Sequence, residues 1–336
     1  MASKISEIKS IAVIVGLDLI GDALIKLSFV RALRAAFPAA HISWLTAQGR
    51  TAFAGPLRAI AAPFIDAVVE RPDYLAALQD KNSAIALPHF DLVIDTRGRW
   101  RWALQARRLP HKVFIAPAAR FLFSERRPPC CWRKPDHMQD RLLQLVELAA
   151  GQAPVVRGGI AVPADDRAKA TQILPDGQTY IGLVPGAGNT VKIWPLPRFI
   201  ALAESQVSAG RVPTFLLGPQ ETGWLTELQS KFASAKFPLQ EPVWGGQLSL
   251  TATMAVGERL KLCVTNDNGT SHMLAAVDCP LISLFGPTAA QKLAPRVSHR
   301  RVIMAQQFGQ DAMDAIPVAA VTAAVEELLK ELGHGA

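Results

Sequence analysis

Short apolar runs of strand length alternate with helix-like stretches along most of this chain, and that alternation restricts the folds open to it. Ser10 to Val15 predicts a buried strand, and from Asp22 onward apolar residues recur at helical spacing until Pro38 ends the helix. Alternating strands and helices are typical of an α/β fold with a mostly parallel sheet covered on both faces. Further strands are predicted at 41–45, 67–70, 92–95 and 113–116, and a helix at 138–149.

The second half of the chain repeats this pattern. Strands are predicted at 180–184, 214–217, 260–264 and 281–285, and helices at 196–209, 221–232, 248–256, 270–277 and 318–332. A chain of 336 residues is long for a single core, which favours two domains of about 150 residues each. We therefore expect two Rossmann-like domains, 1–155 and 156–316, that face a central cleft, followed by a final helix at 317–336.

The loops after the predicted strands are the candidate site segments, because ligands bind beyond the carboxyl ends of the strands in open parallel sheets. In one of these loops, the small residues Ala187 and Gly188 let backbone N–H groups approach an anion closely, and Asn189 and Thr190 add side-chain donors. Lys192 supplies a mobile charge suited to a diphosphate, although a plain strand-to-helix turn accounts for the glycines equally well. The candidate loops are 16–22, 95–99, 185–194, 218–221, 265–272 and 285–288.

The run Asn266-Asp267-Asn268-Gly269-Thr270-Ser271-His272 follows a predicted strand and opens a helix. With Thr270 or Ser271 as the helix cap, free N–H groups and the positive end of the helix dipole lie at the loop, where an anion is stabilised. The simpler interpretation is that Asp267 and Asn268 only form the turn and that His272 is a core histidine. Gly286 and Thr288 offer similar donors after the next strand.

Asp22 is the candidate general base. It follows Gly21 in the first strand-to-helix loop, at a helix N-terminus that stabilises the ionised carboxylate. A plain helix cap is the commoner use of an aspartate at such a position, and Asp18 is a weaker rival for the role of base. Asp95, at the end of another predicted strand, is a candidate for binding a substrate hydroxyl.

Basic and aromatic residues gather in two runs of the first half. The formal net charge of +8 favours acidic partners, such as nucleic acid, an anionic membrane face or a phosphorylated substrate. Either run alone reads as solvated surface, but the two together favour a docking surface for an amphiphilic anion. The runs are 97–102 with Arg107 and Arg108, and 120–134; they carry Trp100, Trp102, Phe121 and Trp132.

The sequence gives little support to a membrane-spanning protein, a secreted protein or a metal-dependent enzyme. No apolar run approaches the ~20 residues of a membrane span, and the polar start lacks the apolar core of a signal peptide, so we expect a cytoplasmic protein. The four cysteines show no spacing typical of disulfides or zinc sites, although adjacent Cys130 and Cys131 also suit a redox pair or half of a metal site. Because the histidines are scattered and no D-x-D pattern is present, we expect neither a metal nor another cofactor.

Several of these motifs occur in an order that resembles glycosyltransferase family 9, the ADP-heptose:lipopolysaccharide heptosyltransferases. The resemblance covers nearly the whole chain, and its most specific part is the C-terminal block that ends in Phe-Gly-Pro-Thr. The motifs are Gly21-Asp22-Ala23-Leu24, the segment 31–38, Lys192-Ile193-Trp194-Pro195, the run 266–272 and Phe285-Gly286-Pro287-Thr288.

The resemblance implies a GT-B fold, an inverting mechanism without metal, and roles for particular residues. Domain 1–155 would bind the acceptor and domain 156–316 the nucleotide sugar, while the helix at 318–332 would pack back across the N-terminal domain. Asp22 would be the base and Lys192, with the backbone of 187–190, would hold the diphosphate. Glu221 would bind the ribose, Asp267 would lie at the donor sugar, and Gly269 to His272 would present a helix N-terminus to the phosphates.

The family pattern is not matched everywhere. Ala187 and Gly188 stand where family members carry Thr-Thr, and Asn268 stands where Thr or Ser is usual. On the acceptor side we expect Asp95, Arg97 and Arg120 to contribute.

The first hypothesis is therefore an inverting heptosyltransferase that uses ADP-heptose and an anionic glycolipid acceptor, such as the lipopolysaccharide core. Peripheral association with the inner membrane face fits that acceptor, whereas nucleic acid is not an expected partner. Two other hypotheses remain open: a sugar-nucleotide epimerase or hydrolase on the same architecture, and a nucleotide-sugar-binding protein without turnover.

Overall fold

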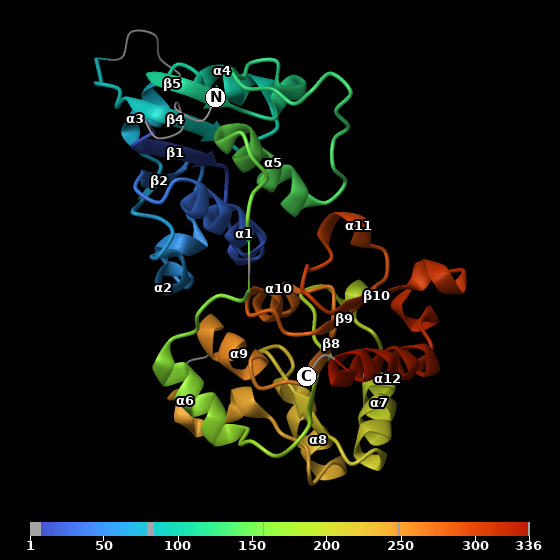
Figure 1. Ribbon diagram of the computed structural model, residues 1–336. Coiled ribbons are helices and arrows are strands. Elements are labelled where there is room, and N and C mark those ends of the chain that lie inside the picture. The colour runs from blue at the N-terminus through green and yellow to red at the C-terminus, as the bar shows by residue number, and fades with distance from the viewer. Residues whose placement is uncertain (1–7, 79–83, 157, 247–248, 335–336) are drawn as a thin grey trace. The chain divides into compact units, whose positions relative to one another are not determined.

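The computed structural model describes the chain except for residues 1–7, 79–83, 157, 247–248 and 335–336 (Figure 1). The chain divides into two compact units, Met1–Arg157 and Gly158–Ala336, close to the division predicted between 155 and 156. Each unit holds a five-stranded sheet whose strand pairs are parallel. The α/β class expected from the alternating pattern is confirmed.

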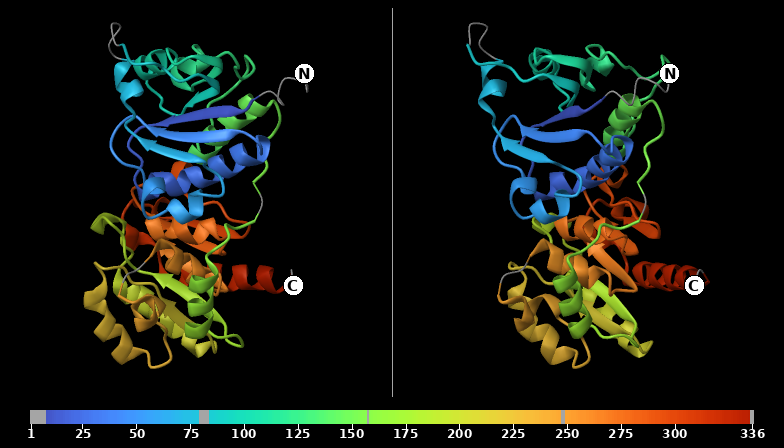
Figure 2. Two further views of the ribbon diagram at one scale, coloured as in Figure 1. Left: turned by 90° about the vertical axis from the view of Figure 1, so that its left-hand side faces the viewer. Right: turned by 60° about the vertical axis from the view of Figure 1, so that its left-hand side comes forward.

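The N-terminal sheet has the order β3-β2-β1-β4-β5, so the first strand lies at its centre. On one face of this strand, Ala12 and Ile14 share a hydrophobic core with Ala103 and Ala106 of α4. Figures 1 and 2 show α1 (blue) on one side of the strands and α4 (teal) on the other. The elements are β1 (Ser10–Val15), α1 (Ile20–Ala36), β2 (His41–Thr46), α2 (Arg58–Ala61), β3 (Ala67–Glu70), α3 (Asp73–Ala77), β4 (Phe90–Asp95), α4 (Trp100–Ala106), β5 (His111–Ile115) and α5 (Met138–Ala150).

The C-terminal sheet has the order β10-β9-β8-β6-β7. On one face, strand residues such as Leu183, Val264 and Leu284 share a core with Phe199 of α7 and Leu228 of α8. The elements are α6 (Ala164–Ile173), β6 (Tyr180–Val184), α7 (Leu196–Ser208), β7 (Val212–Phe215), α8 (Leu225–Lys231), α9 (Leu250–Gly257), β8 (Leu262–Asn266), α10 (Gly269–Ala276), β9 (Leu281–Phe285), α11 (Ala290–Leu293), β10 (Arg300–Met304) and α12 (Val318–His334).

The last helix, α12, contributes to the core of the C-terminal unit. Val321, Val325 and Leu328 of α12 are buried in the core of the C-terminal unit, and the helix packs against α7, β9 and β10. One apolar face of the helix is therefore used within the C-terminal domain, and its packing across the N-terminal domain stays a prediction.

Three elements of the C-terminal unit escaped prediction: the four-residue helix α11, and α6 and β10, whose hydrophobic patterns are weak. In α6 the only buried residue is Ala170, so no apolar stripe marks the helix. The edge strand β10 opens with Arg300 and Arg301, and charged residues on an edge strand protect it from pairing with other chains. Among the described residues, no helix is both long and apolar enough to cross a membrane.

Asp91 ties the beginnings of two central strands together. Its Oδ2 accepts hydrogen bonds from the backbone N–H groups of Lys9 (2.8 Å) and Ser10 (3.0 Å), and Lys112 Nζ lies 2.7 Å from its Oδ1. Although burial acts to raise the pKa of Asp91, these partners lower it from 3.8 to about 2. The ionised carboxylate therefore stabilises the folded state.

Asp91→Asn should destabilise the N-terminal domain by about 2 kcal/mol at pH 7, since one pKa unit corresponds to ~1.4 kcal/mol. A lowered folded-state pKa stabilises the fold above the unfolded pKa, and this contribution is lost as the pH falls from about 4 to about 2. Urea unfolding at several pH values should show the difference between wild type and variant shrinking over that range. Asp165→Asn, at an exposed ion pair, is the control. A difference that stays constant with pH would contradict this origin.

The four cysteines fall into two pairs of opposite exposure. Cys130 and Cys131 are exposed, whereas Cys263 and Cys279 are buried. Burial raises the pKa of Cys279 to about 12, which suppresses its reactive thiolate. We expect a disulfide reagent to titrate two thiols of the native protein quickly and the other two only after unfolding. Fast modification of all four would contradict the burial of the second pair.

Candidate functional site

The clearest polar constellation lies where β6, β8 and β9 end. Asp267, after β8, accepts hydrogen bonds on one oxygen from Lys192 Nζ (2.7 Å) and Thr288 Oγ1 (2.7 Å). Asp267 is 8% exposed, whereas the Lys192 side chain is 28% exposed. A buried carboxylate thus holds a partly exposed ammonium group in place at the carboxyl edge of the sheet. An ammonium group has three donors, so Lys192 keeps capacity for an anionic ligand.

Two asparagine side chains hold the surrounding loops together. Asn266, fully buried at the end of β8, donates to the carbonyl of Pro185 (2.8 Å) and accepts from the N–H of Trp194 (3.1 Å). Asn268 Nδ2 donates to the carbonyl of Gly186 (2.7 Å). The loop after β6 is therefore fastened at both ends to the loop after β8.

Glycines allow a close approach of Glu221 to the same region. Glu221 Oε2 accepts a hydrogen bond from the N–H of Gly218 (2.9 Å). A Cβ atom at Gly186 would lie 2.2 Å from Glu221 Oε1, and one at Gly218 would lie 2.7 Å from Oε2, so a side chain at either position would displace the Glu221 carboxylate. Glu221 precedes a 3₁₀ turn and does not begin a helix as predicted, since α8 starts only at Leu225.

The loop after β6 exposes backbone donors. Gly188, Asn189 and Thr190 are exposed, and within the described part of the chain their N–H groups donate no hydrogen bond. The Asn189 side chain accepts from the N–H of Val191 (3.2 Å), which shapes the turn. Ala187 is almost buried. Exposed N–H groups close to Lys192 suit an anion.

The run 266–272 forms the helix start that was expected, with a different cap. Asn268, not Thr270 or Ser271, is the N-cap of α10, and its side chain accepts from the N–H of Ser271 (2.9 Å). His272 is half-buried, so it is not a fully buried core histidine. Among the described residues, no group of three or more His, Cys, Asp or Glu is placed to hold a metal ion.

Trp194 is packed into the core of the C-terminal domain. It has no exposed surface, and its Nε1 donates to the carbonyl of Ile316 (2.9 Å). Its ring meets that of Phe199 edge to face, with centroids 5.0 Å apart. The Lys-Ile-Trp-Pro motif therefore combines a partly exposed lysine with an anchor in the core.

The two candidate bases of the N-terminal domain are in opposite environments. Asp18 is fully buried and accepts from Thr51 Oγ1 (2.8 Å), Trp44 Nε1 (3.2 Å) and Lys26 Nζ. Asp22 lies in the first turn of α1, exposed, and its carboxylate has no partner within the described residues. The helix begins at Ile20 with Leu19 as its N-cap, so Asp22 is not the cap. Asp22 is the accessible carboxylate and Asp18 a structural one.

The residues expected on the acceptor side do not gather at one place. Asp95 is fully buried, and both its oxygens bind the Arg97 guanidinium, at 2.8 Å and 3.0 Å. Burial raises the pKa of Asp95 despite that neighbour. Because this carboxylate has no exposed surface, the expected hydroxyl contact is corrected: Asp95 positions Arg97, which lies 5.3 Å from the Trp102 ring centroid. Arg120 belongs to a different pocket.

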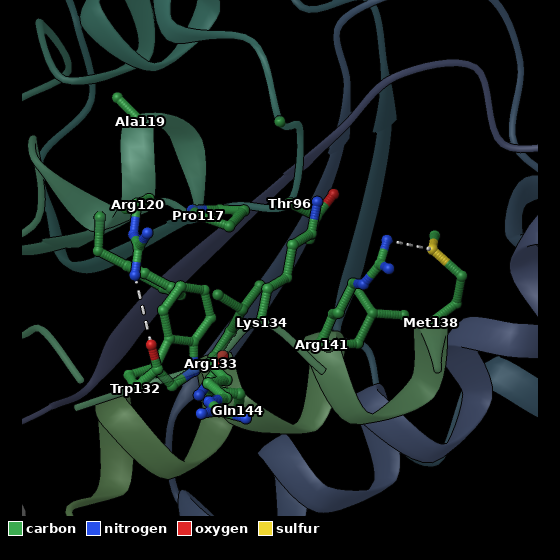
Figure 3. A pocket seen from close by; sticks show the side chains of 14 residues that line it. Thr96, Pro117, Ala119, Arg120, Trp132, Arg133, Lys134, Met138, Arg141 and Gln144 are labelled. Carbon is green, nitrogen blue, oxygen red and sulfur yellow. Dashed lines mark hydrogen bonds between the residues drawn. The ribbon is translucent and has the colours of Figure 1, made fainter. Parts of the chain in front are cut away.

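That pocket, of about 640 Å³, lies within the N-terminal domain. Figure 3 shows Arg120, Lys134 and Arg141 arranged around it, with Trp132 among them. Within the described residues, none of its four cationic side chains forms an ion pair with a carboxylate. Its lining includes the cations Arg120, Arg133, Lys134 and Arg141 and the apolar residues Pro117, Phe121, Trp132, Leu142 and Leu145.

The rim of this pocket has an unusual backbone. Ala119, Arg120 and Phe121 all have positive φ angles, of 48°, 54° and 65°. Such conformations cost about 1–3 kcal/mol each for residues other than glycine and cluster at binding sites. Phe121 is buried against Trp132, with ring centroids 5.3 Å apart. The strained turn places Arg120 at the cavity.

Sequence reasoning did not single out Arg141, which lies on α5 and enters the pocket from the far side of the loop. Its guanidinium donates to the carbonyl groups of Pro135 (2.7 Å) and Asp136 (3.0 Å). The available signal was its spacing, because Met138, Arg141, Leu142 and Leu145 share one helix face and all line the cavity.

The same architecture occurs in known proteins. The sequence matches the model of glycosyltransferase family 9 (heptosyltransferase) over residues 83–314. Lipopolysaccharide heptosyltransferase 2 of Salmonella typhimurium is 28% identical over 136 residues, which are 39% of this chain and 37% of that protein. The chain spans 36% to 55% of the length of the curated relatives that it matches.

Solved structures resemble the chain over almost its full length. The glycosyl transferase family 9 protein of Veillonella parvula has a TM-score of 0.73 at 20% identity, covering 98% of this chain and 99% of that one. E. coli heptosyltransferase WaaC, solved with ADP, has a TM-score of 0.67 at 20% identity, covering 95% and 99%. Two parallel α/β domains of this kind define the GT-B class. Within that class, the chain belongs to glycosyltransferase family 9.

Asn268→Ala should destabilise the C-terminal domain by about 1–2 kcal/mol, because it removes both the cap of α10 and the bond to the Gly186 carbonyl. Asn268→Ser is the matched control, since serine caps a helix but does not replace the second bond. Urea unfolding should place the serine variant between wild type and alanine. Equal stabilities of the serine and alanine variants would show that the cap contributes nothing.

Proposed function

We propose that this chain is an inverting glycosyltransferase that transfers heptose from ADP-heptose to an anionic glycan acceptor of the lipopolysaccharide-core type. The observation that carries the proposal is the constellation of Lys192, Asp267 and Thr288 beside the exposed N–H groups of the loop after β6. Membership of family 9 supports glycosyl transfer as the reaction class.

On the donor side, the diphosphate binds Lys192 and the N–H groups of residues 188–190, with the N-terminus of α10 adding its dipole. Lys192, held by Asp267, neutralises charge on the leaving ADP, a role that other enzymes give to a metal ion. Glu221, between the loops after β6 and β7, binds the ribose. The E. coli relative solved with ADP supports a nucleotide of this type.

On the acceptor side, Asp22 takes the proton of the attacking hydroxyl. The hydroxyl oxygen forms a bond to the anomeric carbon while the bond from that carbon to the diphosphate oxygen breaks, so one displacement inverts the configuration. The exposed position of Asp22 and its lack of a partner within the described residues suit this role. The basic pocket around Arg120 and Arg141 binds the anionic part of the acceptor, and its Trp132 contacts a sugar ring.

The reaction itself provides the test. Purified protein is incubated with ADP-heptose, with and without truncated core lipopolysaccharide, and ADP release is followed. The proposal expects release that depends on the acceptor. Release without acceptor would indicate a hydrolase instead, and binding of nucleotide sugar without release would indicate a protein that has no turnover.

Asp22→Asn should lower kcat by about 10²–10⁴-fold, as removal of a general base does, and leave donor affinity within a few-fold. Asp73→Asn is the matched control, because Asp73 is an exposed aspartate in the first turn of another helix of the same domain. Steady-state rates and donor titration measure the two effects. Turnover like that of the wild type in Asp22→Asn would remove this residue from the mechanism.

Lys192→Met should raise the KM for the nucleotide sugar by roughly 10–100-fold, because a hydrogen bond to a charged group contributes about 1.5–3 kcal/mol. Lys236→Met, at another lysine of the same domain, should leave KM unchanged. Initial rates over a range of donor concentrations provide the measurement. An unchanged KM in Lys192→Met would exclude the lysine from donor binding.

A further inference from the structure

We infer that the outward face of α4, together with Leu122, is a docking surface for an anionic lipid bilayer. This surface, called the α4 surface below, consists of the exposed apolar residues Trp100, Leu104 and Leu122 and the exposed cations Arg99, Arg101, Arg108 and Arg127. It differs from the basic pocket, whose lining includes none of these residues.

The apolar residues of α4 divide between two faces. Ala103 and Ala106 are buried in the domain core. Trp100 and Leu104, one helical turn apart, lie on the other face and are 52% and 41% exposed. An outward helix face of a soluble domain is normally polar, so large apolar side chains there indicate a partner.

Leu122 extends this surface from the next segment. It is 56% exposed, and the short helix just before it, Ala118–Phe121, packs against α4. Its own carbonyl accepts a hydrogen bond from Arg127 Nη2 (2.6 Å), which places a cation beside the exposed leucine. The same pairing recurs on the helix, where the Arg101 guanidinium lies 5.3 Å from the Trp100 ring centroid.

The charged residues of the chain segment that carries this surface have one sign. Between Asp95 and Glu125 the sequence has no acidic residue and seven basic ones: Arg97, Arg99, Arg101, Arg107, Arg108, Lys112 and Arg120. Arg97, Arg107 and Lys112 have carboxylate partners, whereas Arg99, Arg101 and Arg108 form no ion pair within the described residues. These three cations are available to an anionic partner.

A bilayer with anionic lipids matches both the apolar residues and the cations of the α4 surface. Tryptophan and leucine enter the headgroup and upper acyl region, while arginine keeps its charge at the lipid phosphates. Single-stranded nucleic acid would use the tryptophan and the cations, but it offers no use for two exposed leucines. The lipid surface is therefore the occupant that the residues favour.

The α4 surface adjoins the basic pocket along the chain. Gly98, just before α4, and Phe121, just before Leu122, both line that pocket. If the proposed function holds, docking of this surface would bring the pocket to a glycolipid acceptor in the same bilayer. Bilayer binding itself does not depend on that function, since it needs neither donor nor turnover.

The test is co-sedimentation of the full chain with vesicles of phosphatidylcholine alone or with phosphatidylglycerol, without nucleotide sugar. We expect binding to the anionic vesicles that weakens at high salt, and an at least tenfold lower partition coefficient for the double variant Trp100→Ser, Leu104→Ser. Arg101→Ala should reduce binding about fivefold, as expected for one cation near an anionic surface. Val207→Ser, at an exposed apolar residue of α7, is the matched control and should bind like the wild type.

Wild-type protein that fails to bind anionic vesicles, or a double variant that binds them as well as the wild type, would overturn the inference. Preferential binding of single-stranded nucleic acid at the same residues would do so too. Circular dichroism verifies that the variants fold. Transfer to a truncated, water-soluble acceptor should be unchanged in the double variant, so loss of vesicle binding with intact transfer separates this inference from the proposed function.

Discussion

The buried side chain of Asn266 is the interaction on which the candidate donor site depends. It ends β8 and bonds at once to the carbonyl of Pro185 and the N–H of Trp194, at the two ends of the loop that carries Lys192. A buried amide whose donor and acceptor are both used resists displacement, because each lost bond leaves an unpaired polar group in the core. The spacing between Lys192 and Asp267 follows from this fastening.

The N-terminal domain uses the same principle with a carboxylate. Asp18 is buried among Lys26, Trp44 and Thr51, so it joins the loop after β1 to β2 and its neighbouring turn. These hydrogen bonds fix the loop just before α1, and Asp22 lies exposed in the first turn of that helix. In each domain a buried polar residue thus fixes a loop that carries a more exposed polar side chain. The two roles cannot be exchanged, since reactivity requires access and positioning requires burial.

The basic residues of the first half separate into two environments. The run after Pro117 turns inward through three left-handed residues and contributes Arg120, Arg133 and Lys134 to a pocket. The run at α4 faces outward with Trp100 and Leu104 exposed. A pocket suits one anionic group of a defined molecule, whereas an open apolar face with dispersed cations suits an extended surface. The basic residues of the first half therefore occupy two surfaces of different geometry.

The sequence by itself determined the α/β class, the two domains with parallel sheets and most strand positions. Strands such as Ser10–Val15 and Leu281–Phe285 are buried on both faces, so they consist almost entirely of apolar residues and can be recognised as apolar runs. It also predicted that Lys192 and Asp267 lie close together, since loops after parallel strands meet at one edge of the sheet, and their side chains are indeed hydrogen-bonded. It did not reveal α6 or β10, whose patterns are polar, nor the packing of α12, because an amphipathic face does not state which core it covers. Only the tertiary structure showed that Asp18 is buried and Asp22 exposed, that Asp95 supports Arg97, and that Asn268 caps α10. Each of these depends on burial and on partners distant in the chain, which residue type and spacing do not encode.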